Sequence, residues 1–124
     1  MQEPTYDPSR PMPSIEIAYS YKLVDIPNKT MVSLRIEFPP NGSTPPPSAW
    51  GRKRTVLNKM NEEPMKTIQE GGSWFEAPGC HHRISDNASK TEAATLIATM
   101  VTDTEVFERD GMGALIQIDE EYRK

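Results

Sequence analysis

The sequence predicts an all-β fold, a small β-barrel or jelly roll. Short runs of alternating apolar and polar residues recur along the chain, which is the pattern of half-buried strands. The 12 prolines and 7 glycines divide these runs with turns, and no run has strong helical spacing. With 124 residues and an apolar content of 35%, the chain has the size of one domain with one core.

Residues 1–13 carry four prolines among polar residues, so they cannot hold a regular strand or helix. We predict an extended N-terminal arm here. A loose tail is the simpler interpretation, and a segment lying over the barrel or a partner subunit is the alternative. Residues 14–124 then form a single barrel domain.

Strict alternation begins at residue 14 and predicts two strands joined by a turn at residues 27–29. The first run has Ile15, Ile17, Tyr19 and Tyr21 on the predicted inward face. The second has Val32, Leu34, Ile36 and Phe38 inward. Inward tyrosines can line a ligand cavity, so Tyr19 and Tyr21 are candidate ligand-binding residues, although core packing is the stronger expectation.

Further short strands are predicted at residues 55–60, 65–68, 73–77, 80–85, 105–108 and 113–118. The apolar run after Thr91 predicts a strand buried on both faces, and residues 86–90 predict a polar loop. Within the run 80–85, alternation places Cys80, His82 and Ile84 on one face and the two intervening residues on the other.

Residues 71–87 hold both histidines and the only cysteine, between a Gly71-Gly72 turn and an Asp86-Asn87 end. This stretch resembles the second conserved motif of the cupins, G-x5-P-x-G-x2-H-x3-N. The first glycine, the glycine after the proline and the histidine have counterparts in Gly71, Gly79 and His82. Ala77 stands at the proline position, and Asp86 stands at the final asparagine.

The wider run 55–122 is similar to small single-domain cupin proteins of filamentous fungi. The resemblance implies a cupin-type β-barrel and makes His82 a candidate metal ligand. It also implies a His-x-His motif before Thr55, which this chain lacks, with Pro47 at the expected place of the first histidine. One strand near residues 47–54 is therefore predicted to be shortened or missing, through evolved loss or an altered exon boundary.

A divalent metal ion needs three or four protein ligands. The sequence offers His82, with Cys80 and Glu76 as secondary candidates. We prefer an interpretation in which Cys80 packs as a small hydrophobe and His82 is hydrogen-bonded inside the fold. No cofactor is then expected, and any that binds should be divalent Fe, Mn, Zn or Ni. A nucleophilic cysteine–histidine pair is the last choice, because neighbours on one strand face are widely spaced.

The net charge of −4 argues against a general nucleic-acid-binding surface. The only basic cluster, at residues 52–54, is predicted to be solvated. No apolar run is long enough to span a membrane, and the N-terminus lacks the order of a signal peptide. One cysteine suits a reducing compartment, so we expect a cytoplasmic protein.

The function expected from these features is binding of a small organic ligand inside a cupin barrel that has lost its metal chemistry. Trp74 and Glu76 join the two tyrosines as candidate ligand-binding residues. One alternative is a metal-dependent cupin enzyme, acting as a dioxygenase, decarboxylase or isomerase on a small oxygenated metabolite, with His82 as ligand. Another is a homodimeric interaction module, or an inactive product, whose exposed strand edge has to pair.

Overall fold

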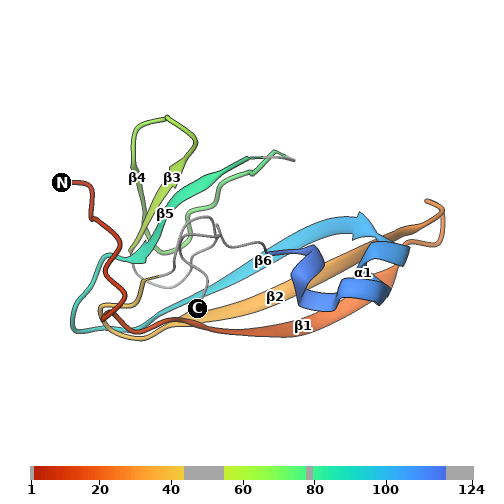
Figure 1. Cartoon of the computed structure of the whole chain (residues 1–124), viewed down its shortest axis with the longest axis horizontal. Helices are drawn as coiled ribbons and strands as arrows, with labels where there is room; N and C mark the ends of the chain where they lie inside the picture. Colours follow the sequence, from red (N-terminus) through yellow and green to blue (C-terminus); the bar gives the residue numbers. More distant parts are fainter. Residues whose placement is uncertain (1, 44–54, 78–79, 117–124) are drawn as a thin grey trace.

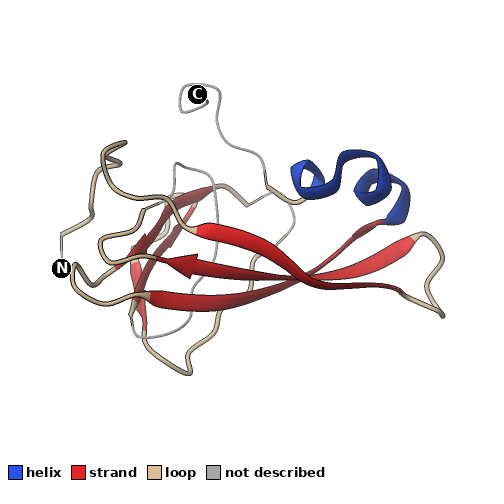
Figure 2. Ribbon diagram, turned by 90° about the horizontal axis from the view of Figure 1, so that it is seen from below, coloured by secondary structure: helices blue, strands red, loops and turns tan. Residues whose placement is uncertain are grey.

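The computed structural model describes residues 2–43, 55–77 and 80–116, which form two three-stranded antiparallel sheets and one short helix (Figure 1). The first sheet has the strand order β1 (Ser14–Lys22), β2 (Lys29–Phe38), β6 (Ala94–Asp103). The second has the order β4 (Lys66–Ile68), β3 (Val56–Met60), β5 (His82–Asn87). Helix α1 (Thr104–Asp110) continues into the 3-10 turn η1 (Gly111–Ala114) and covers one face of the first sheet (Figure 2).

The mostly β class is confirmed, but the predicted closed barrel is not found among the described residues. Ser43, in the segment after β2, forms one isolated bridge with Asp86 of β5, and no ladder joins the two sheets within the described residues. The strand predicted to be shortened or missing falls at residues 47–54, outside the described part of the chain.

The core lies on the helix-covered face of the first sheet. The four inward residues predicted for β2 are all fully buried: Val32, Leu34, Ile36 and Phe38. They pack with alternate residues of β6 and with Val56 of the second sheet. The burial of β6 alternates, so the prediction of a strand buried on both faces was wrong. The turn before β2 is confirmed, with Asn28 in the left-handed region at φ 58°.

A β-bulge in β1 reverses which side chains face the core. Ile17 lies opposite Leu34, whereas Tyr19 lies opposite Ser33, so Ala18 is an extra residue in the ladder. Because paired residues share a face, Tyr19 and Tyr21 lie on the face away from the core. Their predicted inward orientation is therefore wrong, and both are exposed.

The two strands predicted at residues 105–108 and 113–118 are replaced by α1 and η1, with residues 117–118 outside the description. Glu105 in the first turn and Arg109 in the last complement the helix dipole, and Gly111 ends the helix at φ 57°. Phe107 and Met112 pack against the core. Tertiary packing of this apolar face outweighs the weak strand propensity of so short a segment.

The strands predicted at residues 55–60 and 65–68 are confirmed as β3 and β4. Residues 73–77 form no strand, and the predicted polar loop at residues 86–90 instead begins inside β5. A second bulge interrupts β5: Lys59 pairs with Ile84, but Met60 pairs with His82, which leaves Arg83 as the extra residue. His82 and Ile84 therefore lie on opposite faces of the sheet, and the prediction that they share one face was wrong.

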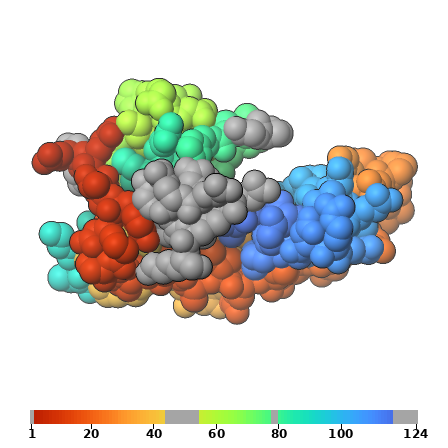
Figure 3. All heavy atoms as spheres, in the orientation of Figure 1, coloured from red at the N-terminus to blue at the C-terminus, as the bar shows by residue number. Residues whose placement is uncertain are grey.

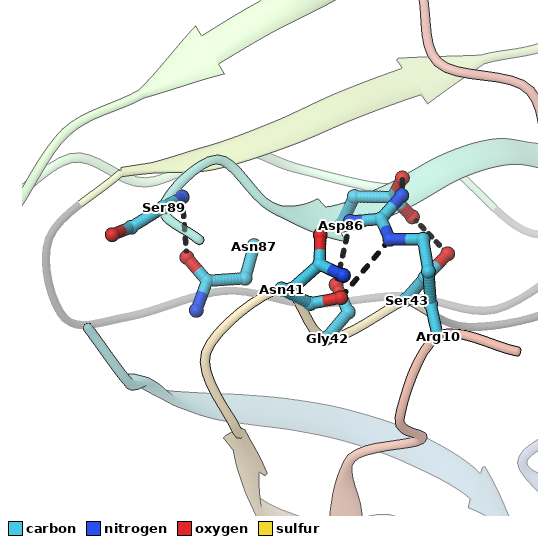
Figure 4. A network of polar contacts seen from close by, with 7 residues as sticks. All are labelled: Arg10, Asn41, Gly42, Ser43, Asp86, Asn87 and Ser89. Carbon is cyan, nitrogen blue, oxygen red and sulfur yellow. Dashed lines mark hydrogen bonds and ion pairs between the residues drawn. The ribbon is translucent and has the colours of Figure 1, made fainter. Parts of the chain in front are cut away.

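The N-terminal arm is bound to the second sheet (Figures 3 and 4). Arg10 Nη1 donates to Asp86 Oδ2 at 2.8 Å, and its other guanidinium nitrogens donate to the carbonyl oxygens of Asn41 and Gly42. Nearer the N-terminus, Glu3 accepts two hydrogen bonds from Lys59 Nζ at 2.9 Å. Asp86 and Lys59 share one face of the sheet, so the arm lies along that face. The simpler expectation of a loose tail was wrong.

Candidate functional site

The candidate site is built around His82 at the start of β5. Its side chain lies on the face of the second sheet that carries Asn58 of the neighbouring strand β3. The ring nitrogen Nε2 is hydrogen-bonded to Asn58 Oδ1. Because that oxygen is an acceptor, Nε2 carries the proton and Nδ1 is the acceptor nitrogen of the neutral ring.

Glu76 approaches the opposite nitrogen of this ring from the segment before β5. Its Oε1 lies 3.5 Å from His82 Nδ1 and accepts a hydrogen bond from Trp74 Nε1 at 2.7 Å. The His82 side chain is 3% exposed and that of Glu76 is 18% exposed. An indole, a carboxyl and an imidazole thus meet at one partly buried place.

The protonation states of the pair follow from its burial. Burial lowers the pKa of His82 from 6.5 to about 4, and charge repulsion from His81 adds to the lowering. Burial raises the pKa of Glu76, against the opposing effect of the hydrogen bond from Trp74. Both shifts disfavour an ion pair, so His82 is neutral at neutral pH.

This arrangement can recognise a hydroxyl or carboxyl group. A hydroxyl hydrogen can be donated to the carboxylate of Glu76, which is 18% exposed, and a protonated Glu76 can itself donate. His82 lies behind this carboxyl and is buried, with 3% of its side chain exposed. Because the two groups are partly buried, a hydrogen bond made there gains strength from the low local dielectric constant. The half-buried indole of Trp74 offers an apolar surface beside these polar atoms.

The other predicted site residues, and Asp86 at the last position of the cupin-like motif, make different contacts. Cys80 lies beside Asn61, whose Nδ2 is 3.8 Å from Sγ. The carboxylate of Asp86 binds Arg10 and Ser43 Oγ on the opposite face of the sheet (Figure 4). Tyr19 and Tyr21 belong to the first sheet, on its face away from the core.

The donor set does not fit a catalytic metal ion as it stands. The 3.5 Å between His82 Nδ1 and Glu76 Oε1 matches the separation of about 3.4 Å expected for two ligands of a tetrahedral ion. Catalytic zinc sites use three protein ligands, however, and the described residues contain no group of three His, Cys, Asp or Glu side chains able to hold a metal. The segment 44–54 adds no such residue type to the sequence.

Asn58 was not anticipated as a member of the site. It is 2% exposed and sits in a strand whose neighbours are Leu57 and Lys59. One feature of the sequence could have indicated it: Asn58 lies between Val56 and Met60 on the same face of β3. A buried amide at such a position needs a hydrogen-bond partner. Which partner it has depends on the bulge at Arg83, which the sequence pattern does not reveal.

Comparison with protein families, with characterised proteins and with solved structures finds no match for this chain. No helix in the described part of the chain is long and apolar enough to cross a membrane. The functional argument therefore rests on the site itself.

Proposed function

We propose that the protein binds a small organic ligand at the Trp74–Glu76–His82 cluster, on a cupin-like arrangement of sheets, without metal chemistry. The observation that carries the proposal is the buried carboxyl–imidazole pair, with Glu76 Oε1 shared between Trp74 Nε1 at 2.7 Å and His82 Nδ1 at 3.5 Å. Groups with perturbed pKa values that meet in one place are the features by which binding sites are recognised.

The cupin-like assignment is supported by the resemblance of residues 71–87 to the second cupin motif. The histidine of that motif corresponds to His82, which begins β5 and is buried. Ligand binding by the cluster does not require a closed barrel, because Asn58, Glu76 and Trp74 all lie within the second sheet and the segment leading into it.

The chemistry of the cluster suggests a small aromatic ligand with a hydroxyl or carboxyl group. The indole of Trp74 can contact an aromatic ring, while the carboxyl of Glu76, which lies 3.5 Å from His82 Nδ1, binds the substituent. Phenol, catechol and benzoate are therefore suitable probes, since they share the ring and differ in the hydrogen bonds they make.

Tryptophan fluorescence tests the proposal. A Trp50→Phe variant leaves Trp74 as the only indole, so a saturable change on titration reports binding at the cluster. Glu76→Gln and His82→Gln should weaken binding of the best probe at least tenfold, because the first removes the ligand's carboxylate partner and the second removes the imidazole beside that carboxylate. His81→Gln is the matched control and should bind normally. A saturable signal that Glu76→Gln and His82→Gln leave unchanged would contradict the proposal.

A metal-dependent enzyme is the second candidate, favoured only by the ligand-like spacing of Glu76 and His82. It needs a third donor from outside the described residues, where the acidic residues are Asp119, Glu120 and Glu121. Mass-spectrometric metal analysis of the folded protein distinguishes the two functions. Near-stoichiometric Fe, Mn, Zn or Ni that is lost in His82→Ala would favour the enzyme.

A further inference from the structure

Glu76 is a partly buried acid whose negative charge no cation of the described chain offsets. Its ion-pair partner among the described residues is the imidazole of His82, and no Lys or Arg of residues 2–43, 55–77 and 80–116 is ion-paired with it. The His82 ring is neutral, so it supplies no positive charge. A carboxylate at position 76 therefore keeps a negative charge that the described protein does not balance.

Asp86, the more deeply buried acid of the second sheet, shows the contrast. Its carboxylate is ion-paired with Arg10 at 2.8 Å and accepts a hydrogen bond from Ser43 Oγ at 2.8 Å (Figure 4). Buried carboxylates are usually paired in this way, because removing an unpaired charge from water is costly. Asp86 is completed by the protein itself, whereas Glu76 has room for a partner from outside the chain.

The side-chain donors of the cluster are already engaged within the protein. Trp74 Nε1 donates to Glu76 Oε1 at 2.7 Å, and His82 Nε2 is bonded to Asn58 Oδ1. The His82 nitrogen that faces Glu76 is Nδ1, the acceptor nitrogen of the neutral ring, and it also lies against Oε1. The other carboxylate oxygen, Oε2, takes part in neither contact. The three side chains of the cluster therefore offer a ligand an acceptor oxygen and no further N–H group.

We propose that Glu76 makes the site selective for ligands whose polar group donates a hydrogen bond, and that it excludes anionic ligands. The inference rests on the ligand-binding function proposed above and narrows its ligand class from hydroxyl or carboxyl compounds to hydrogen-bond donors. A neutral hydroxyl and a protonated amine share this chemistry, because each presents a hydrogen to Oε2. A carboxylate presents only acceptor oxygens, so it meets Glu76 as a like charge.

Partial burial makes this selection effective. A hydrogen bond to a charged acceptor is about twice as strong as one between neutral groups. An analogue without the donor leaves the carboxylate unpaired when it covers the site, and sites built to bind a hydroxyl strongly reject such analogues. The indole of Trp74 contacts the ring of either kind of ligand. The difference in affinity between matched probes therefore reports the contact with Glu76.

Four probes that share a benzene ring test the selectivity. Fluorescence titrations in the Trp50→Phe background at pH 8 compare phenol, benzylamine, anisole and benzoate. Phenol is a neutral donor and benzylamine a cationic one, whereas anisole has no hydrogen on its oxygen and benzoate is an anion. The better of phenol and benzylamine should bind at least tenfold more tightly than anisole and benzoate. Which of the two donors binds more tightly distinguishes a hydroxyl ligand from an amine.

Glu76→Gln tests the residue itself through a gain of binding. The amide is uncharged and carries an N–H donor, so benzoate should bind this variant at least tenfold more tightly than it binds the natural chain. Misfolding of the variant cannot produce such a gain. Glu70→Gln is the matched control, because it removes the same charge from an exposed position, and it should leave the order of the four probes unchanged.

The possible results separate this inference from the ligand proposal. If none of the four probes gives a saturable change, both are refuted. If anisole or benzoate binds the natural chain as tightly as the better donor, the cluster binds ligands without selecting donors, and only this inference fails. It also fails if benzoate binds a folded Glu76→Gln variant no better than the natural chain. The order of the probes on the natural chain is measured without a substitution in the cluster, so it does not depend on the folding of any variant there.

Discussion

Replacing Arg10 with alanine tests whether the N-terminal arm is part of the folded structure. The guanidinium makes three hydrogen bonds, at 2.8 Å to Asp86, 3.0 Å to Asn41 and 3.2 Å to Gly42. Its removal leaves the carboxylate of Asp86, whose side chain is 6% exposed, with Ser43 Oγ as its remaining partner among these contacts. Breaking a buried pair in this way costs 3–5 kcal/mol, but Arg10 is 14% exposed and water can partly replace it. We expect a loss of about 2–3 kcal/mol.

Urea denaturation at pH 7, followed by circular dichroism, measures this loss. Lys22→Ala is the matched control, because it breaks the ion pair with Glu108, in which both side chains are more than half exposed. Such a pair contributes at most about 1 kcal/mol. A loss for Arg10→Ala no larger than that of Lys22→Ala would refute the docked arm. In an Asp86→Asn background, the loss on removing Arg10 should shrink, since no charge is left unpaired.

The loss of stability caused by Arg10→Ala should depend on pH. Burial raises the pKa of Asp86, and the hydrogen bond from Ser43 and the charge of Arg10 oppose this rise. Without Arg10 the pKa in the folded state rises further. A carboxyl with a raised pKa stabilises the fold at low pH, and that contribution is lost as pH rises through the folded pKa. The loss caused by Arg10→Ala should therefore be largest at neutral pH and shrink at acid pH.

Three further predictions concern single side chains. The pKa of His82 falls from 6.5 to about 4 on folding. The free energy of unfolding is therefore highest above pH 6.5 and decreases as the pH falls toward 4. The difference in unfolding free energy between the natural chain and His82→Gln should change by about 3 kcal/mol over that range, and a flat difference would contradict the burial argument. Glu76 has a raised pKa, so Glu76→Gln should be at least as stable as the natural chain at pH 7 and lose any advantage at pH 4. Phe38→Ala should cost about 3–5 kcal/mol and the exposed Ile97→Ala less than about 0.5 kcal/mol, both measured by urea denaturation.

The alternation of apolar residues was sufficient to predict β2. Its inward set is fully buried, because a central strand with one covered face must bury every second side chain. The same reasoning failed in β1 and β5, where one extra residue in each strand reverses the faces beyond it. Neither Ala18 nor Arg83 has a local signal for a bulge, since both are compatible with regular strands.

The candidate site was predicted in part. His82 and Glu76 were selected as candidate ligands of one site, and the structure brings them together. Cys80 was placed with them by alternation alone, whereas it contacts Asn61 beyond the start of β5. The role of Asn58 depends on the pairing of β3 with β5, a contact between residues 24 apart in the chain. Such partners follow from strand register, which one sequence does not specify where a bulge intervenes.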